Sequence, residues 1–236
     1  MSQLHVTNLH AHYGQSHVLQ GVNFDVRAGS ITTILGRNGS GRSTTLKAMM
    51  GIVSPTEGSV RFDDTELAGL SPTRISRFGI AYVPEDRQVF PNLSVGENLL
   101  VGVQKARPDT PVWTIADMYQ HFPRLKERRD QVAATLSGGE QQMLTICRSL
   151  LGNPKVLLVD EPTEGLAPQI VAQVRDVLVE IRNRGVTIIL VEQRLTMALQ
   201  IADSVLVMGH GQIVYSGSVV EFRKDTTVRK RWLEVA

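Results

Sequence analysis

A glycine-rich segment early in the chain has the residue types and spacing needed to hold phosphate. Residues 36–44 read GRNGSGRST and follow the short apolar stretch 31–35. Glycines let backbone amides turn toward phosphate oxygens, and a helix beginning here, which we expect over 46–51, adds partial positive charge. The spacing predicts a phosphate loop with Ser43 as a Mg²⁺ ligand, and an ordinary glycine-rich turn is the alternative. The predicted ATP-binding residues of this loop are Gly36, Arg37, Asn38, Gly39, Ser40, Gly41, Arg42, Ser43 and Thr44.

Arg42 occupies the position at which this pattern has lysine. A guanidinium is planar, wider and more weakly hydrated than the compact ammonium of lysine. Because moving a transition-state contact by about 1 Å can cost on the order of 100-fold in rate, we expect slow hydrolysis and weaker ATP binding in this loop. The alternative is that Arg42 adapts and the loop is fully active.

An acidic pair ends a second apolar stretch. Residues 156–159 are apolar, and Asp160 and Glu161 follow them. A carboxylate at the tip of a strand can hold Mg²⁺, and the next one can polarise the water that attacks a γ-phosphate. An acidic pair after four apolar residues is common by chance, so the interpretation depends on its position after the phosphate loop.

A third segment, residues 136–142, reads LSGGEQQ. Ser137 suits the N-cap of a helix that Glu140 starts, and the two glycines, which lack side chains, leave the backbone accessible. Alone, this segment predicts only a capping box. Together with the phosphate loop and the acidic pair, in this order, it resembles the signature sequence of the ABC ATPase family. The similarity covers essentially the whole chain.

This resemblance implies a fold and a dimer. The fold is an α/β P-loop NTPase (RecA-like) core with an N-terminal antiparallel β subdomain and an inserted helical subdomain. Two such domains pair head to tail and enclose Mg²⁺ and ATP between the phosphate loop of one and the signature of the other. The residues expected to act on the partner's nucleotide are Ser137, Gly138, Gly139 and Glu140.

The resemblance also assigns roles to single residues. Tyr13 matches the aromatic residue that stacks on adenine, and a surface aromatic residue is the alternative. Asp160 matches the metal-side carboxylate, and Glu161 matches the hydrolytic carboxylate. Residues 164–167 match the D-loop, which crosses to the partner domain.

Two departures from the general ABC pattern point to one branch of the family. Glu85 stands where the Q-loop usually has glutamine, and we assign it to the metal site with Ser43 and Asp160. Gln193 stands where the switch residue is usually histidine, and we assign it a catalytic role. The residues around both positions are similar to the ATP-binding subunits of branched-chain (hydrophobic) amino-acid importers. The related urea importers have a similar subunit.

Membership of this branch implies partners. They are a second ABC ATPase, identical or different, integral membrane permease subunits and, indirectly, a substrate-binding protein. Val89 and Phe90 lie where family members receive the coupling helix of the permease, although packing within the helical part is equally expected. The transported molecule contacts other chains, so no residue here identifies it.

The elements that must position these residues follow from hydrophobic patterning. Residues 4–6, 22–26 and 59–62 alternate polar and apolar side chains, which predicts half-exposed antiparallel strands. Short apolar stretches separated by an amphipathic helical pattern over 168–183 predict a parallel sheet. The apolar stretches are residues 31–35, 156–159, 186–191 and 204–208.

The middle of the chain has a different pattern. Helix-like stretches cover residues 95–104, 113–122, 123–129 and 140–151, with no convincing strand between 85 and 151. We therefore expect one ABC ATPase domain over 1–236. In it, 1–84 and 152–236 form the core with the antiparallel β subdomain, and 85–151 form the helical subdomain that carries the signature.

The composition and the length of the apolar stretches disfavour some classes of protein. The net charge of +2 is too small to favour nucleic acid as a partner. The apolar stretches are far shorter than the roughly 20 residues that span a bilayer. We expect a cytoplasmic protein, peripheral on the inner face of the cell membrane. Two other classes remain: a non-transport ABC ATPase, disfavoured because long coiled-coil insertions and a tandem domain are absent from the sequence, and a catalytically silent structural subunit.

Overall fold

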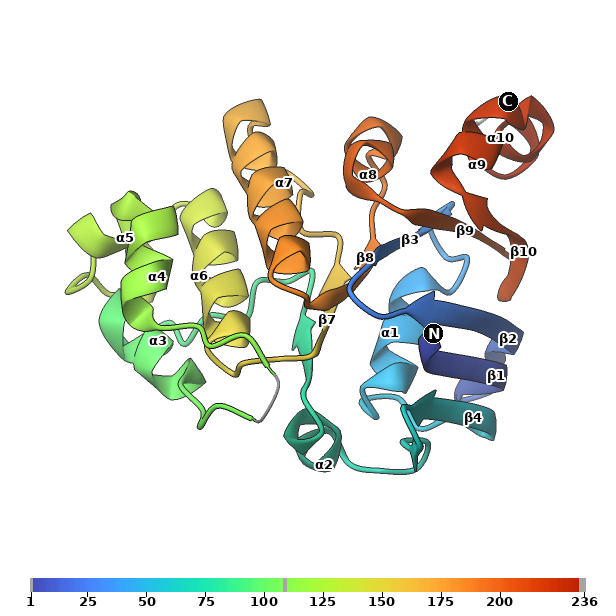
Figure 1. Ribbon diagram of the computed structural model, residues 1–236, viewed down its shortest axis with the longest axis horizontal. Helices are drawn as coiled ribbons and strands as arrows, with labels where there is room; N and C mark the ends of the chain where they lie inside the picture. The colour runs from blue at the N-terminus through green and yellow to red at the C-terminus, as the bar shows by residue number, and fades with distance from the viewer. Residues whose placement is uncertain (1, 108–109, 234–236) are drawn as a thin grey trace.

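The computed structural model describes residues 2–107 and 110–233, and it contains two β-sheets flanked by helices (Figure 1). In the larger sheet, five strands are parallel and the edge strand β10 is antiparallel to its neighbour β9. Every residue of β7 and β8 is buried, as expected for parallel strands covered on both faces. The strands, in spatial order, are β10 (Gln212–Ser218), β9 (Ser204–Gly209), β3 (Ile31–Gly36), β8 (Thr187–Val191), β7 (Val156–Asp160) and β6 (Ile80–Val83).

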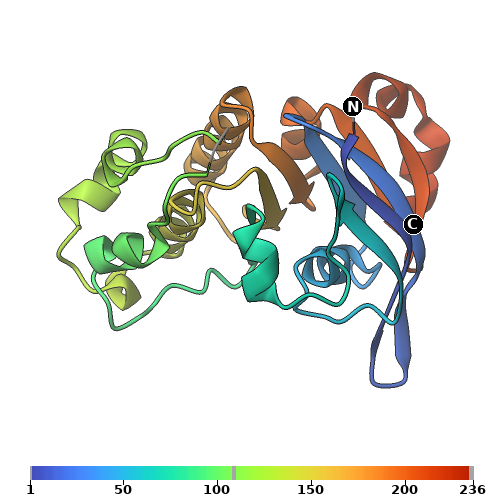
Figure 2. The same ribbon diagram turned by 60° about the horizontal axis from the view of Figure 1, so that its bottom comes forward.

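The second sheet is antiparallel and lies at the N-terminal side, as predicted. Its long hairpin joins β1 (Ser2–Tyr13) to β2 (Ser16–Arg27) and projects from the body of the molecule (Figure 2). The other two strands are β4 (Glu57–Phe62) and β5 (Thr65–Glu66). The hairpin carries Tyr13 at the end of β1.

Alternate residues of the three parallel strands β6, β7 and β8 face two separate cores, because successive side chains of a strand point to opposite faces. One face packs against α1 (Arg42–Met49) and the antiparallel sheet, and the opposite face packs against α6 (Gly138–Leu150), α7 (Pro168–Asn183) and α8 (Leu195–Ile201). A third, smaller core lies around Phe222 and includes Val205 and Val207 of β9. In β7, for example, Leu158 belongs to the first core and Leu157 to the second. The predicted α/β P-loop NTPase fold is therefore confirmed.

Between 85 and 151, the described residues form helices and no named strand, as predicted. They lie to one side of the sheets in Figure 1, beyond α7 (Pro168–Asn183). The helices are α3 (Val95–Gly102), α4 (Ile115–His121), α5 (Pro123–Glu127), the short 3₁₀ helix Ala133–Thr135 and α6 (Gly138–Leu150).

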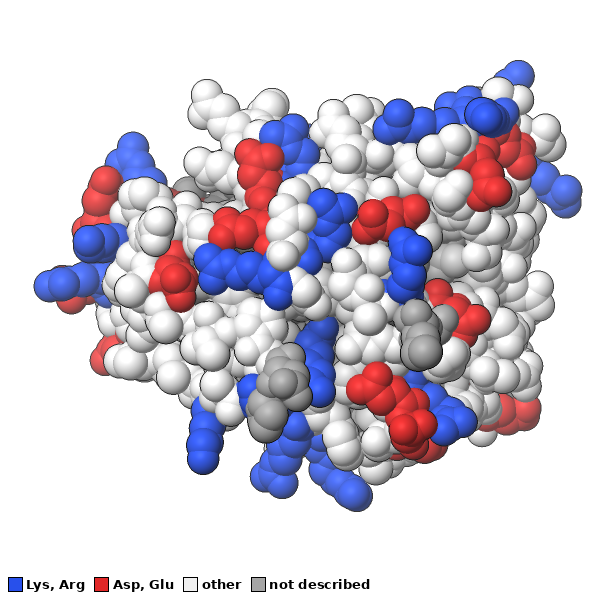
Figure 3. All heavy atoms as spheres, in the orientation of Figure 1, with Lys and Arg blue, Asp and Glu red and all other residues white. Residues whose placement is uncertain are grey.

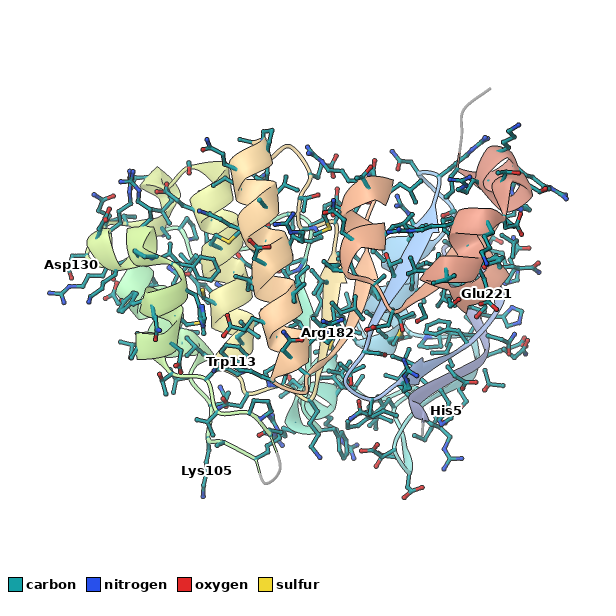
Figure 4. All side chains as sticks on the ribbon, turned by 45° about the horizontal axis from the view of Figure 1, so that its top comes forward. His5, Lys105, Trp113, Asp130, Arg182 and Glu221 are labelled. Carbon is teal, nitrogen blue, oxygen red and sulfur yellow. The ribbon has the colours of Figure 1, made fainter. Side chains whose placement is uncertain are left out.

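The helical part contacts the C-terminal half of α7. The guanidinium of Arg184 lies 4.1 Å from the centre of the Trp113 ring, and His121 lies 3.1 Å from Glu180. Figure 4 shows Trp113 and, at the adjoining end of α7, Arg182. The remaining helices are α2 (Pro72–Arg77), α8 (Leu195–Ile201), α9 (Val219–Lys224) and α10 (Thr226–Trp232).

Two local expectations need correction. The helix after the phosphate loop begins at Arg42, not at residue 46, so Arg42 and Ser43 lie in its first turn. Strand β6 gave no signal in the sequence. It has only four residues, of which Ile80 and Val83 are buried, and this is too short for a periodic pattern.

The surface seen in Figure 3 carries Lys and Arg interspersed with Asp and Glu, and basic side chains gather near α9 and α10. No helix among residues 2–107 and 110–233 is long and apolar enough to cross a bilayer.

Candidate functional site

The phosphate loop connects β3 to α1, with its glycines in conformations that suit a cradle. Gly39 and Gly41 have φ of 76° and 106°, in the left-handed region that favours glycine. A Cβ atom at Gly36 would lie 2.5 Å from the carbonyl oxygen of Met208, so the loop could not carry a side chain there. The buried Ser40 hydroxyl has no hydrogen-bond partner within the described part of the chain. An unsatisfied buried hydroxyl beside a helix N-terminus fits a loop that binds phosphate.

A hydroxyl and a carboxylate meet beside this loop. Ser43 Oγ donates a 2.8 Å hydrogen bond to Asp160 Oδ1, and Tyr82 Oη donates a 2.9 Å bond to Asp160 Oδ2. Burial and the neighbouring Asp160 charge raise the pKa of Tyr82, so the phenol remains a donor. Hydroxyl and carboxylate oxygens are ligands that Mg²⁺ prefers, and the Ser43–Asp160 pair fits such an ion.

Arg42 is held by protein groups rather than reaching into open space. Its Nη2 donates to Glu161 Oε1 at 2.8 Å and to Asn38 Oδ1 at 3.1 Å, and Nη1 donates to the Glu192 carbonyl oxygen at 3.3 Å. The side chains of Arg42 and Glu161 are only 4% and 6% exposed. The phosphate-loop cation and the predicted hydrolytic carboxylate therefore form a buried ion pair.

Both carboxylate oxygens of Glu161 have partners. Oε1 accepts from Arg42, and Oε2 accepts a short hydrogen bond from Gln193 Nε2. Burial raises the pKa of Glu161 to about 7, although Arg42 and the Gln193 hydrogen bond act in the opposite direction. Two predicted catalytic residues, Glu161 and Gln193, are thus in direct contact.

Most of the predicted site residues line one cavity of about 420 Å³. They come from the β1–β2 hairpin, the phosphate loop, the ends of β6, β7 and β8, and the turn after β7. Tyr13, which lines this cavity, is 49% exposed. The lining residues are Tyr13, Val18, Asn38, Gly39, Gly41, Arg42, Ser43, Thr44, Glu85, Glu161, Glu164 and Gln193.

Glu85 lies in this cavity among other carboxylates. Single oxygen atoms of Glu85, Glu161 and Glu164 lie within 4.8 Å of one another. Burial is the main cause that raises the pKa of Glu85. A hydrogen bond with Glu164 and the negative charge of Glu164 raise it further. Glu164 and Tyr82 are site residues that the sequence patterns did not assign. Their only signals were a D-loop position and a lone aromatic residue in a short apolar stretch.

The signature residues lie apart from this cavity. Ser137 caps α6: its Oγ donates to Glu140 Oε2 at 2.7 Å, and its backbone N–H donates to the same oxygen at 2.9 Å. Glu140 also pairs with Arg128 at 3.1 Å. Ser137, Gly139 and Glu140 line a different cavity, of about 390 Å³, beside Ile170. Within one chain, the fold does not bring the signature to the phosphate loop.

A third cavity, of about 620 Å³, opens between α2, β6, α3 and α6. Phe90 lines it with its side chain 44% exposed, whereas Val89 packs against the interior core. The exposed apolar side chains Ile52 and Val101 also line it. Of the two predicted permease anchors, only Phe90 therefore lies in this groove.

The sequence and the fold are similar to those of known proteins. The family model described as ABC transporter matches residues 19–164. The chain is 42% identical over 222 residues to the high-affinity branched-chain amino acid transport ATP-binding protein BraG of Pseudomonas aeruginosa, covering 94% of this chain and 95% of that protein. It is 35% identical over 228 residues to the probable branched-chain amino acid transport ATP-binding protein LivF of Archaeoglobus fulgidus, covering 96% and 97%. A crystal structure of a nucleotide-free ATP-binding cassette from an ABC transporter superposes with a TM-score of 0.82, at 29% identity and 97% coverage of both chains.

Proposed function

Because this chain belongs to the ABC transporter family as an ATP-binding, ATPase-type subunit, we propose that it hydrolyses Mg-ATP to drive an importer of branched-chain or other hydrophobic amino acids. The observation that carries the proposal is the cavity that gathers Tyr13, the phosphate loop, Glu161 and Gln193 from separate parts of the chain. The names of the relatives BraG and LivF support the substrate class.

Nucleotide binding is assigned to the cavity as follows. Tyr13 stacks on the adenine ring, and the amides of residues 36–44 hold the phosphates. Ser43 and Asp160 hold Mg²⁺, and Glu85 lines the same cavity as Ser43. When bound, Mg²⁺ supplies positive charge to the β- and γ-phosphates.

Hydrolysis requires a base, and Glu161 is our candidate. A carboxylate beside the γ-phosphate can accept a proton from the attacking water. Each of its oxygens already accepts one hydrogen bond, from Arg42 or from Gln193, so the attacking water competes with these donors for the carboxylate. This competition supports slow turnover at this chain's own phosphate loop. It also keeps a second candidate open, a nucleotide-binding but hydrolysis-impaired partner of an active ATPase.

We assign the signature residues to a partner's nucleotide. Ser137, Gly139 and Glu140 line a cavity separate from that of the phosphate loop, so we expect the signature to reach a phosphate loop only across a head-to-tail dimer. The partner is a second ABC ATPase, identical or different. Each of the two composite sites then takes one half from this chain.

The groove with Phe90 is the proposed contact with the membrane subunits. Exposed apolar side chains around a cavity mark a protein-binding surface, and Ile52, Phe90 and Val101 provide them here. Docking there places the chain on the inner face of the cell membrane, where a substrate-binding protein acts indirectly through the permease.

The proposal is tested first by nucleotide binding to the purified chain. A fluorescent ATP analogue should bind more tightly with Mg²⁺ than without it, and Ser43→Ala should lose that difference. Absence of any affinity for adenine nucleotides would contradict the proposal. The substrate is tested in proteoliposomes that contain the chain with its partner ATPase and permease. ATP-dependent uptake of leucine supports the amino-acid assignment, and uptake of urea without leucine supports the urea alternative.

A further inference from the structure

Arg87 lies between two elements that we assign to the dimer interface. Its Nη2 donates a 3.2 Å hydrogen bond to the carbonyl oxygen of Glu164 and lies 3.7 Å from where a Cβ of Gly165 would stand. A Cβ atom on Gly138 would lie 2.4 Å from Arg87 Nη1. One guanidinium therefore fills the space between the signature turn and the turn after β7.

The backbone of Arg87 is held in an unfavourable conformation. Arg87 and Gln88 have φ of 63° and 27°, values that L-residues other than asparagine and aspartate rarely adopt. The Arg87 carbonyl oxygen accepts a short hydrogen bond from Thr145 Oγ1 on α6. Local strain of this kind persists only where the surroundings fix it, and it clusters at functional sites.

The same short segment lines the groove. Arg148 of α6 donates a short hydrogen bond to the Gln88 carbonyl oxygen, and its guanidinium lies 4.6 Å from the centre of the Phe90 ring. Gln88, Phe90 and Arg148 all line the 620 Å³ cavity. Residues 87–90 therefore connect the groove to the helix that begins with the signature.

From these contacts, we propose that Arg87 is a positioning residue that sets the spacing between the signature turn and the turn at Glu164, and so places both against the partner's nucleotide. The inference rests on the proposed head-to-tail dimer. It concerns hydrolysis at the partner's phosphate loop, because Arg87 does not line this chain's nucleotide cavity.

The contact itself is tested on the purified chain by a double-mutant cycle of melting temperature. Gly138→Ala should force the guanidinium out and lower the melting temperature by about 2–4 °C. In the Arg87→Ala background, the same substitution should cause little further loss, because the space is already open. Additive shifts would show that Arg87 does not occupy this position, and the proposal would be wrong. This cycle does not depend on nucleotide, so its outcome is separate from that of the ATP-binding test.

The positioning role is tested in the assembled transporter. Arg87→Ala should lower kcat by on the order of 10- to 100-fold, as expected for a misplaced transition-state contact, while KM for ATP stays unchanged. Arg87→Lys should recover part of the loss, because an ammonium can still donate to the Glu164 carbonyl. Arg61→Ala, at an exposed position of β4, is the matched control and should behave as the unmodified protein. An unchanged kcat, or a rise in KM alone, would overturn the role.

Discussion

The phosphate loop and the signature turn differ in how their polar groups are satisfied. In the phosphate loop, Arg42 and Glu161 are almost fully buried and bonded to each other across the fold. In the signature turn, Ser137 and Glu140 bond to each other within one helical turn. We expect the donors of the first arrangement to compete with the attacking water for Glu161, and the second arrangement to need only a partner's phosphates. We infer that the composite site using this chain's signature is the faster of the two.

Blocking the signature is the most direct test of which composite site hydrolyses ATP faster. Gly138→Leu should lower the turnover of the assembled transporter by on the order of 100-fold or more, because the side chain displaces the contact to the partner's nucleotide. The loss should exceed that caused by Glu161→Gln. Steady-state ATPase measurements on both variants decide the order, and a larger loss with Glu161→Gln would reverse our assignment of the faster site.

Restoring lysine in the phosphate loop should reduce the difference in hydrolysis rate between the two composite sites. Arg42→Lys replaces a guanidinium that donates to Glu161 and Asn38 with a compact ammonium that can reach the phosphates. Turnover of the assembled transporter should rise by about tenfold, since about 1.4 kcal/mol of recovered transition-state binding gives that factor. Arg61→Lys is the control for the change of cation alone. No change in ATPase rate would show that the loop already works at full speed.

ATP binding to this chain can be measured in the absence of a second ATPase subunit. Tyr13→Ala should weaken ATP binding to the purified chain by about tenfold, because stacking of a base on an aromatic ring contributes roughly 1–3 kcal/mol. Tyr13→Trp should retain most of the affinity, because it preserves the ring. Isothermal titration checks both, and equal affinities for all three proteins would assign adenine to another residue.

The smallest expected effect concerns the stability of the signature turn. Glu140 is partly buried, which raises its pKa, but hydrogen bonds from Ser137 and the charge of Arg128 outweigh this and lower it. A lowered pKa stabilises the fold above the ordinary glutamate value of 4.5, and this contribution is lost as pH falls below that value.

Ser137→Ala, which removes the cap, should therefore lower the melting temperature at pH 7 by about 2–4 °C, the shift for about 1 kcal/mol in a domain of this size. The difference from the unmodified protein should shrink as the pH is lowered through the acid range. A difference that stays constant with pH would show that the Glu140 carboxylate does not contribute to the cap.

Motifs formed by neighbouring residues were predictable because their chemistry depends on local spacing. The phosphate loop, the acidic pair at the end of β7 and the capping box of α6 each lie within nine residues or fewer in the sequence. Helix α7 followed from periodicity over enough residues to be distinctive, whereas β1 and β2 were predicted only over residues 4–6 and 22–26 of their 12 residues each. Strand β6 did not, because four residues carry too little pattern.

Contacts between distant residues were not predictable in the same way. The sequence placed a cation at residue 42 and a carboxylate at residue 161, but nothing in either pattern says that they pair. That pairing depends on α1 and β7 lying side by side in the fold. The positions of Glu164, Tyr82 and Arg87 depend likewise on turns that meet only after the chain has folded.

The sequence by itself determined the fold class, the family and the residue types available for phosphate, metal and water, because these follow from local pattern. Only the tertiary structure decided which of those groups already have hydrogen-bond partners within the protein. It buried Arg42 against Glu161, placed Gln193 on the same carboxylate and kept the signature away from the phosphate loop. The physical reason is that hydrogen-bond partners and desolvation depend on which segments the core brings together.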